Sequence, residues 1–386
     1  LFQSSADFWF CRVRFWSPKS KNKDEVSIFL VRIFKLTPMK LKTAVFYNFP
    51  HLLNYPFTQL LFVILLLASC QPEQSKIIAV TGEIPASAIG KTLHHEHLLV
   101  DFIGADSTGY HRWNRDSVVE KVLPYLLEIK ALGYKTLVEC TPAYIGRDPL
   151  LLKMLSEKSG IQILTNTGYY SAVGGKFIPK HGFEETAQQL ANRWIAEATN
   201  GIEGTGIYPG FIKIAVERAP LQEINRKVVE AACIAHKATG LTIMSHTGPA
   251  IPAFQEIEIL KQNSISPSAF IWTHANNEKE WSKIINAAKM GVWIAFDKFE
   301  EKETENFSEF AVLMKKEGLL NRLLFSHDAG WYDPMKPGGG TFRDFTAIEK
   351  FLIPALQQKG FSEKEISQIF ELNTAEAFAI KIRLAE

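Results

Sequence analysis

Short apolar runs alternate with longer amphipathic stretches from about residue 77 to the end of the chain. The runs are four to six residues long, which is typical of buried parallel strands. They occupy residues 91–95, 135–139, 162–167, 210–215, 241–245, 269–273, 292–296 and 323–326. The stretches between them repeat apolar residues at helical spacing. The clearest helices are expected over residues 116–132, 149–159, 184–199, 225–239, 278–289, 307–317 and 343–359.

This alternation predicts the fold class. Eight strand and helix pairs over about 300 residues match the size of a single closed eight-stranded barrel. The main alternative is a doubly wound open sheet. Against that alternative, no Gly-x-Gly-x-x-Gly sequence follows the first strand, and polar residues end five separate runs rather than meeting at one switch point. We therefore expect an α/β fold, a single (β/α)8 TIM barrel, over residues 77–386.

The N-terminal part of the chain has a different pattern. Lys40 and Lys42 precede an apolar run over residues 60–67, which is too short to span a bilayer and has the layout of a secretory signal. The run continues into Leu-Ala-Ser-Cys, which ends at Cys70 and resembles the bacterial lipobox, in which the cysteine thiol is acylated. The alternatives are an uncleaved anchor helix or a chance cysteine after an apolar run.

These features predict the organisation of the whole chain. Residues 1–38 begin with Leu and are expected to be an upstream or non-native extension, with translation starting at Met39. A lipoprotein signal peptide is expected over residues 39–69 and a tether over residues 70–76. The protein would then be anchored to a membrane through lipid on Cys70, in the bacterial cell envelope at the periplasmic face or the outer membrane.

Composition narrows the choice of partners. With 46% apolar and 22% charged residues, the 386-residue chain has enough material for a large core. Its formal net charge is +2 and its basic residues are scattered, so we expect no nucleic-acid partner. Cys140 and Cys233 lie in apolar patterns, which favours buried thiols over a disulfide.

Histidines occur at three places where apolar runs end. His95 and His97 are two residues apart, so on an extended segment their imidazoles share one face, while His94 points to the other. His246 and His274 each end a later run. Because the carboxyl ends of parallel strands meet at one rim, these imidazoles are expected to converge, and neutral imidazoles suit a divalent transition metal. The alternative for each single histidine is a hydrogen-bonded loop residue.

Lys213 and Asp328 complete this set of candidates. Lys213 lies in Phe-Ile-Lys-Ile-Ala, where alternation points its amine into the barrel. Burial lowers the pKa of a lysine, and a neutral amine can add carbon dioxide to form a carbamate that bridges two cations. An ion pair with a nearby carboxylate is the alternative, and this segment alone favours it. Asp328 follows the last strand, where a carboxylate can bind metal and accept a proton from bound water.

The order of these residues resembles the phosphotriesterase family, including its phosphotriesterase-like lactonases, within the amidohydrolase superfamily. The resemblance covers residues 80–380 and begins with Gly-Lys-Thr-Leu-His-His-Glu-His at residues 90–97. It implies two divalent metal ions, zinc in most members and otherwise Mn2+, Co2+ or Fe2+. A hydroxide and Lys213 carboxylated by CO2 would bridge them, and Asp328 would act as general base. The metal ligands implied are His95 and His97 for the buried ion, His246 and His274 for the exposed ion, Lys213 for both, and Asp328 for the first.

Three further residues are candidates for substrate contact. Thr-Gly-Tyr-Tyr at residues 167–170 resembles Thr-Gly-x-Tyr of the lactonase branch, which favours Tyr170 as an orienting residue, with a packing aromatic as the alternative. Trp331 lies in the long segment after the last strand, which is expected to form a pocket wall. Lys298 stands where relatives have histidine or arginine and is a candidate for binding an anionic group.

The function expected from the resemblance is hydrolysis of an ester bond in a small molecule, with a lactone as first choice. A phosphotriester or other phosphoester is the alternative. Asn277 stands where relatives carry an aspartate, and an amide cannot carry a proton. A metal-bearing binding protein without turnover is therefore a further alternative. Arg112 and Trp113 are expected to be additional wall residues, and a homodimer is expected by analogy with the paired barrels of the family.

Overall fold

A computed structural model describes residues 75–385. The expected signal peptide, the tether up to residue 74 and the lipidation site Cys70 lie outside the described residues. Within residues 75–385, none of the helices combines the length and apolar character that a membrane span requires.

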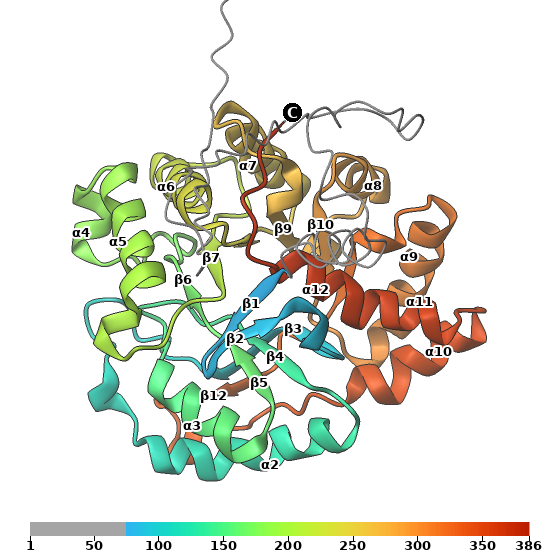
Figure 1. The fold of residues 1–386 in the computed structure, drawn as a ribbon, viewed down its shortest axis with the longest axis horizontal. Coiled ribbons are helices and arrows are strands. Elements are labelled where there is room, and N and C mark those ends of the chain that lie inside the picture. Colours follow the sequence, from blue (N-terminus) through green and yellow to red (C-terminus); the bar gives the residue numbers. More distant parts are fainter. Residues whose placement is uncertain (1–74, 386) are drawn as a thin grey trace, which may run out of the picture. The chain divides into compact units, whose positions relative to one another are not determined.

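Parallel strands form two hydrogen-bonded arcs around one centre (Figure 1). The first arc has the order β12-β3-β4-β5, and the second has the order β11-β10-β9-β8-β7-β6. Only Thr165 separates β5 from β6, so one arc continues directly into the other. The strands are β3 Thr92–Leu99, β4 Thr136–Glu139, β5 Gln162–Leu164, β6 Asn166–Thr167, β7 Phe211–Ala215, β8 Ile243–His246, β9 Phe270–Thr273, β10 Trp293–Phe296, β11 Leu323–Phe325 and β12 Gly330–Tyr332.

The expected α/β fold with parallel strands is confirmed, with two local differences. The run expected as one strand over residues 162–167 is split at Thr165, whose carbonyl accepts a hydrogen bond from the Gly210 N–H (2.8 Å). Strand β3 carries a bulge between Leu93 and Glu96, so strict alternation does not hold across His94 and His95. His94 is fully buried, and neither of its ring nitrogens has a hydrogen-bond partner among the described residues.

Helices surround the strands (Figure 1). They are α2 Arg115–Ala131, α3 Pro149–Ser159, α4 Lys180–Glu184, α5 Ala187–Asn200, α6 Glu223–Thr239, α7 Ala250–Gln262, α8 Trp281–Lys289, α9 Thr304–Lys316, α10 Ile353–Gln358, α11 Glu363–Ser367 and α12 Asn373–Phe378. The helix expected over residues 184–199 is interrupted because Thr186 and Gln189 form a capping box that starts α5. The helix expected from residue 343 begins later, at a π-helix over Ile348–Leu352, because Asp344 accepts the Thr346 N–H in a turn.

The hairpin of β1 (Lys76–Ala79) and β2 (Gly82–Pro85) packs at the amino end of the parallel strands, where the Val80 N–H donates to the Ile163 carbonyl (2.8 Å). Apolar side chains fill the barrel interior next to this hairpin, among them Val138, Leu164, Phe211, Met244, Ile271, Trp293 and Leu324. The amino end is therefore closed. Polar side chains at the opposite, carboxyl end of the strands are the ones that can meet a ligand.

Candidate metal centre

Four imidazoles and one carboxylate converge at the carboxyl end of the strands. One oxygen of Asp328 lies 3.1 Å from His97 Nε2 and 3.7 Å from His95 Nε2. The other oxygen lies 3.9 Å from His274 Nε2, which is in turn 2.8 Å from Nδ1 of His246. These residues come from β3, β8 and the segments after β9 and β11, so the structure brings together five of the six metal ligands expected from the sequence.

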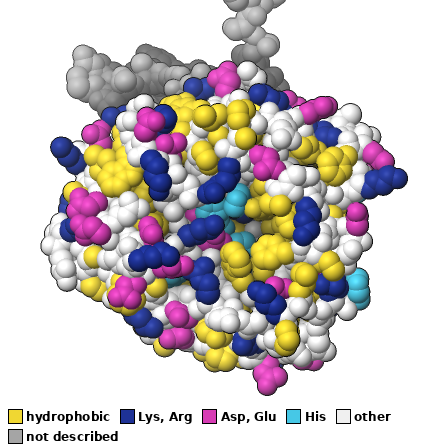
Figure 2. Space-filling view, turned by 180° about the vertical axis from the view of Figure 1, so that it is seen from behind, with side chains coloured by type: hydrophobic (Ala, Val, Ile, Leu, Met, Phe, Trp, Pro, Cys, Tyr) yellow, Lys and Arg dark blue, Asp and Glu magenta, His cyan; other side chains and the backbone are white. Residues whose placement is uncertain are grey.

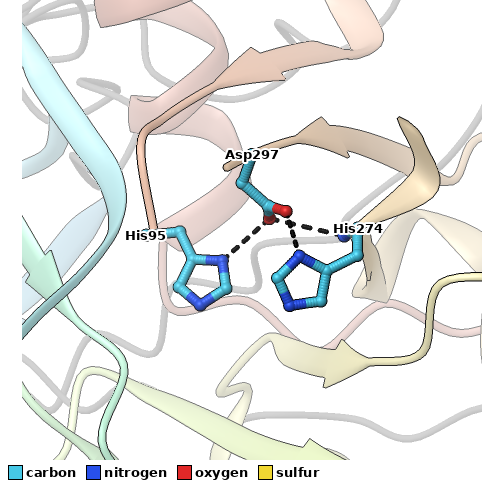
Figure 3. A group of neighbouring side chains, drawn as sticks. All are labelled: His95, His274 and Asp297. Carbon is cyan, nitrogen blue, oxygen red and sulfur yellow. Dashed lines mark hydrogen bonds and ion pairs between the residues drawn. The ribbon is translucent and has the colours of Figure 1, made fainter. Parts of the chain in front are cut away.

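The other ring nitrogens are held by supporting groups (Figure 3). Asp297, directly after β10, accepts from Nδ1 of His95 (2.8 Å), from Nδ1 of His274 and from the His274 backbone N–H (3.4 Å). His97 Nδ1 contacts Thr141 Oγ1 at 2.8 Å. With Nδ1 engaged, the Nε2 atoms of His95, His97 and His274 are directed at the centre, as in metal sites where a carboxylate orients a ligating histidine, whereas His246 presents Nδ1.

Asp297 belongs to this support rather than to the ligands. Two groups of three side chains are close enough to hold a metal ion. One group is His95, His274 and Asp297, and the other is His95, His97 and Asp328. The Asp297 oxygens already accept from both imidazoles, whereas Asp328 faces their free Nε2 atoms. The sequence reasoning did not assign a role to Asp297 or Thr141. The available signal was that Asp297 ends a strand on the same rim as the expected ligands.

Lys213 is the sixth expected ligand, and its amine is buried inside the barrel with 1% exposure. Nζ has no hydrogen-bond partner, and no carboxylate of residues 75–385 lies within ion-pairing distance of it. Burial lowers the pKa of Lys213, although Asp297 and Asp328 are near enough for their charges to act against this. The contacts of the described residues therefore argue against the ion pair that was the alternative.

The donor set fits a divalent metal. Imidazole nitrogens and a carboxylate are the ligands that zinc and similar ions prefer. Burial lowers the pKa of His95 to about 3, so this imidazole is neutral at physiological pH. Burial opposes ionisation of Asp328, but the charges of His95, His97 and His274 outweigh it and hold the pKa of this carboxyl below its usual value. An unpartnered amine, the neutral His95 imidazole and an ionised carboxylate match a cation site.

Backbone strain is concentrated at the same rim. His274, Lys298, Asp328 and Trp331 have φ angles of 60°, 65°, 50° and 77°. A left-handed conformation costs a residue other than glycine about 1 kcal/mol or more, and such strain is typical of functional sites. At His274, Asp328 and Lys298, the strained backbone accompanies side chains that meet at the Asp328 carboxylate.

Glu96 fixes the segment that carries Asp328. Its carboxylate accepts hydrogen bonds from Ser326 Oγ (2.7 Å), from the N–H (3.0 Å) and Nδ1 (2.8 Å) of His327, and from the Ala329 N–H (2.8 Å). His327 points away from the centre, and its Nε2 accepts the Ile348 N–H at 3.1 Å. Strand β3 therefore supplies two candidate ligands and, between them, the group that holds a third candidate in place.

The expected substrate contacts also lie at this rim. The ring of Tyr170 is 5.1 Å from that of His246, and the ring of Trp331 is 6.1 Å from that of His97. Lys298 Nζ is 4.0 Å from an oxygen of Asp328.

Arg112 and Trp113, expected as wall residues, instead bind carboxylates. Arg112 pairs with Asp101 (2.6 Å), and the indole N–H of Trp113 donates to Asp148 (2.9 Å). These two residues therefore support the loops after β3 and β4, and their contacts do not place them at the metal centre.

Residues 75–378 match the model of the phosphotriesterase family. The chain belongs to this family. The phosphotriesterase family consists of binuclear metal enzymes, in keeping with the donor set described above.

Two similar proteins align with this chain over nearly their full length. The chain is 26% identical over 293 residues to the phosphotriesterase homology protein of Escherichia coli K12, covering 75% of this chain and 98% of that protein. It is also 26% identical over 307 residues to an aryldialkylphosphatase of Saccharolobus solfataricus, covering 77% of this chain and 97% of that enzyme.

Solved structures of phosphotriesterase-family enzymes have the same fold. An organophosphorus hydrolase from Deinococcus radiodurans superimposes with a TM-score of 0.70 at 25% identity, covering 80% of this chain and 98% of that one. An enzyme engineered for organophosphate hydrolysis from a weak, promiscuous lactonase superimposes with a TM-score of 0.71 at 26% identity, covering 79% and 100%.

A buried carboxyl group supports the β8 end of this phosphotriesterase-family site. Glu256 on α7 accepts from Thr247 Oγ1 (2.6 Å) and contacts Ser245 Oγ. It therefore binds the residues on both sides of His246, a candidate ligand. Burial raises the pKa of Glu256 to about 8, more than these hydrogen bonds and the charge of Lys213 lower it. The group is therefore protonated in the folded protein at neutral pH.

We expect Glu256→Gln to remove a pH-dependent loss of stability. Because the folded-state pKa lies above the ordinary value of 4.5, the folded protein keeps a proton that the unfolded chain releases, and stability falls as pH rises from 4.5 to about 8. A Gln side chain does not titrate, so the variant does not show this decline. Relative to the parent, its free energy of unfolding should rise by roughly 1 kcal/mol per pH unit in this window. Urea unfolding of the metal-free protein at pH 5, 6.5 and 8 measures the difference. Exposed Glu258→Gln on the same helix is the control, and parallel pH profiles of the Glu256 variant and the parent would contradict the assignment.

Proposed function

We propose that this protein is a metal-dependent hydrolase that opens a lactone, a cyclic carboxylic ester. The observation that carries the choice of bond is the position of Tyr170 beside His246 at the mouth of the centre. Burial raises the pKa of Tyr170, and the charge of Asp328 adds to this, so the phenol stays protonated and can donate a hydrogen bond to an ester oxygen. Likeness to an enzyme engineered from a lactonase supports the same choice.

The residues of the site have distinct roles in this proposal. His95, His97, His246, His274 and Asp328 would hold two divalent cations, with zinc the first choice. Lys213 would join them after its neutral amine adds CO2, forming an N–C bond and releasing a proton. Bound metal lowers the pKa of water and polarises the bond under attack. Asp328 is ionised and faces the imidazole Nε2 atoms, so it can accept the proton of the attacking water. Tyr170 would orient the ester.

The test compares substrate classes on the purified chain supplied with zinc or manganese. We expect kcat/KM for γ- and δ-lactones to exceed that for aryl dialkyl phosphotriesters by about tenfold or more, the effect of one interaction made only with the preferred transition state. A preference for phosphotriesters would overturn the lactone assignment. Two bound metals with no turnover on either class would indicate a metal-bearing binding protein.

Phosphotriester hydrolysis is the second candidate. It is favoured by the names of two similar proteins, the aryldialkylphosphatase of Saccharolobus solfataricus and the organophosphorus hydrolase of Deinococcus radiodurans. The same donor set and the same base would serve either bond, because both reactions add water to a polarised centre.

We also propose that the protein is lipid-anchored in the bacterial cell envelope through Cys70, on the basis of the Leu-Ala-Ser-Cys sequence alone. Metabolic labelling with palmitate in a bacterial host should mark the parent chain and fail to mark Cys70→Ser. Equal labelling of both chains would contradict the anchor.

A further inference from the structure

One half of the mouth around the metal centre is aromatic. Trp331, next to His97, is 5.7 Å from Phe102, and Phe102 is 6.2 Å from Phe177. Phe177 is 5.7 Å from Tyr170, which reaches His246. These four rings form a continuous aromatic arc, Trp331–Phe102–Phe177–Tyr170, that joins the two ends of the histidine cluster. The rings come from the segments after β3 and β6 and from β12.

The other half of the mouth is polar and cationic. Lys298, after β10, has a side chain that is 49% exposed, and its one ion pair is the 4.0 Å contact with Asp328. Arg218, after β7, is exposed and has neither a hydrogen bond nor an ion pair with any residue of the described chain. Its Nε lies 3.6 Å from where a β-carbon would stand at Gly248, two residues after His246, and Asn277 Nδ2 lies 3.4 Å from that point on the same rim.

Acidic side chains of the same rim are already engaged. Glu217, next to Arg218, accepts the Gly174 N–H at 2.7 Å. Glu300 pairs with Lys302 at 2.7 Å and with Arg343 at 3.5 Å. Asp328 faces three imidazoles. Among the described residues, Arg218 therefore has no carboxylate partner, and Lys298 has only the long 4.0 Å contact with Asp328. Both cations lie at the rim of the candidate metal centre.

The space-filling view agrees with this division of the mouth. Figure 2 shows the face opposite the β1–β2 hairpin, with histidine side chains at its centre. Lys and Arg side chains lie directly beside these histidines, and a group of hydrophobic side chains lies on the other side of them. A compound lying across the centre would contact rings at one end and cationic groups at the other.

We propose that the substrate carries an anionic group, a carboxylate or a sulfonate, which Lys298 and Arg218 bind while the aromatic arc covers the apolar part. The proposal rests on the hydrolase function proposed above and specifies the class of its substrate. Lys298 has a strained, left-handed backbone and a half-exposed ammonium. This arrangement suits the binding of a ligand better than a role in folding. A charge-assisted hydrogen bond to this ammonium would raise affinity or rate by about tenfold to a hundredfold.

Two esters of matched length provide the kinetic test. Mono-p-nitrophenyl glutarate carries a terminal carboxylate, and p-nitrophenyl pentanoate is its neutral counterpart. We expect the parent enzyme with zinc to prefer the glutarate ester, and Lys298→Met to lower the ratio of kcat/KM for that ester to kcat/KM for the neutral ester by about tenfold or more. Arg218→Gln should act in the same direction. Lys302→Met, which removes a positive charge from the same loop beside Glu300, is the control and should keep the preference.

A binding measurement separates this proposal from the hydrolase function. Isothermal titration of the zinc-loaded full chain with glutarate and with propane-1-sulfonate needs no turnover, and the two ligands distinguish carboxylate from sulfonate. Weaker binding of either anion to Lys298→Met than to Lys302→Met supports the anion site, even if no ester is hydrolysed. The proposal is overturned if the parent hydrolyses both esters without preferring the anionic one, or if Lys298→Met and the parent bind both anions equally.

Discussion

Replacing Asp328 with Asn should lower kcat by about a hundredfold to ten-thousandfold and leave the fold intact. Asn keeps the shape and one acceptor oxygen, but it carries no charge and cannot take a proton. The carboxylate of Asp328 faces three imidazoles and is ionised, so both its proposed ligand role and its proposed role as base depend on the lost charge. Steady-state kinetics on the preferred ester, together with circular dichroism and metal analysis, measure the effect.

Asp116→Asn is the matched control, because it makes the same chemical change on the exposed start of α2. It should leave kcat unchanged. Equal rates for the Asp328 variant and the parent would remove Asp328 as the base, whereas loss of metal with loss of rate would show that its ligand role dominates.

Lys213→Met should have opposite effects on metal binding and on the stability of the metal-free protein. Loss of the amine would remove the proposed bridging ligand, so metal content should fall from two ions per chain to one or fewer. Met fills a similar volume without a polar atom, and Nζ of Lys213 is buried without a partner. The metal-free variant should therefore be more stable than the metal-free parent by about 1–3 kcal/mol.

Metal analysis of dialysed protein with and without bicarbonate, and urea unfolding in the presence of a chelator, check the two effects separately. Only the parent should gain metal when bicarbonate is added. Exposed Lys237→Met on α6 is the control. Two metal ions bound to the Lys213 variant would count against a carbamate bridge, and a less stable metal-free variant would show that the amine has a partner in the folded chain.

The strand and helix order could be predicted because each buried strand is a short apolar run and each helix an amphipathic one. Residues 149–159 are a helix with the expected bounds, since Asp148 caps its start and Gly160 ends it. The break at Thr165 and strand β12 could not be predicted. The break depends on the hydrogen bond from the Gly210 N–H to Thr165. Strand β12 depends on its pairing with His97 and Leu99 of β3, which lie far away in the sequence.

The candidate ligands could be located because strand ends meet at one rim, but their supporting groups could not. Asp297 and Thr141 are ordinary residues in the sequence, and their roles follow only from the direction of each imidazole Nδ1. The bulge in β3 also changes the sequence-based alternation at His94. Sequence patterns therefore indicate which residues approach the centre, and the geometry between strands decides which of them bind and which support.

The hydrogen bonds from Ser326 and Ala329 to Glu96 divide the segment after β11 into two parts, an inner part held by Glu96 and an outer turn. The segment from Ser326 to Ala329 is held from within the barrel, whereas the turn beyond Tyr332 makes no hydrogen bond to Glu96 among the described residues and can change composition without breaking that link. New substrate preferences can thus evolve by insertions and drift in that outer turn while the reacting groups keep their positions. Grafting the corresponding turns of related enzymes onto this chain would be the natural way to redirect it.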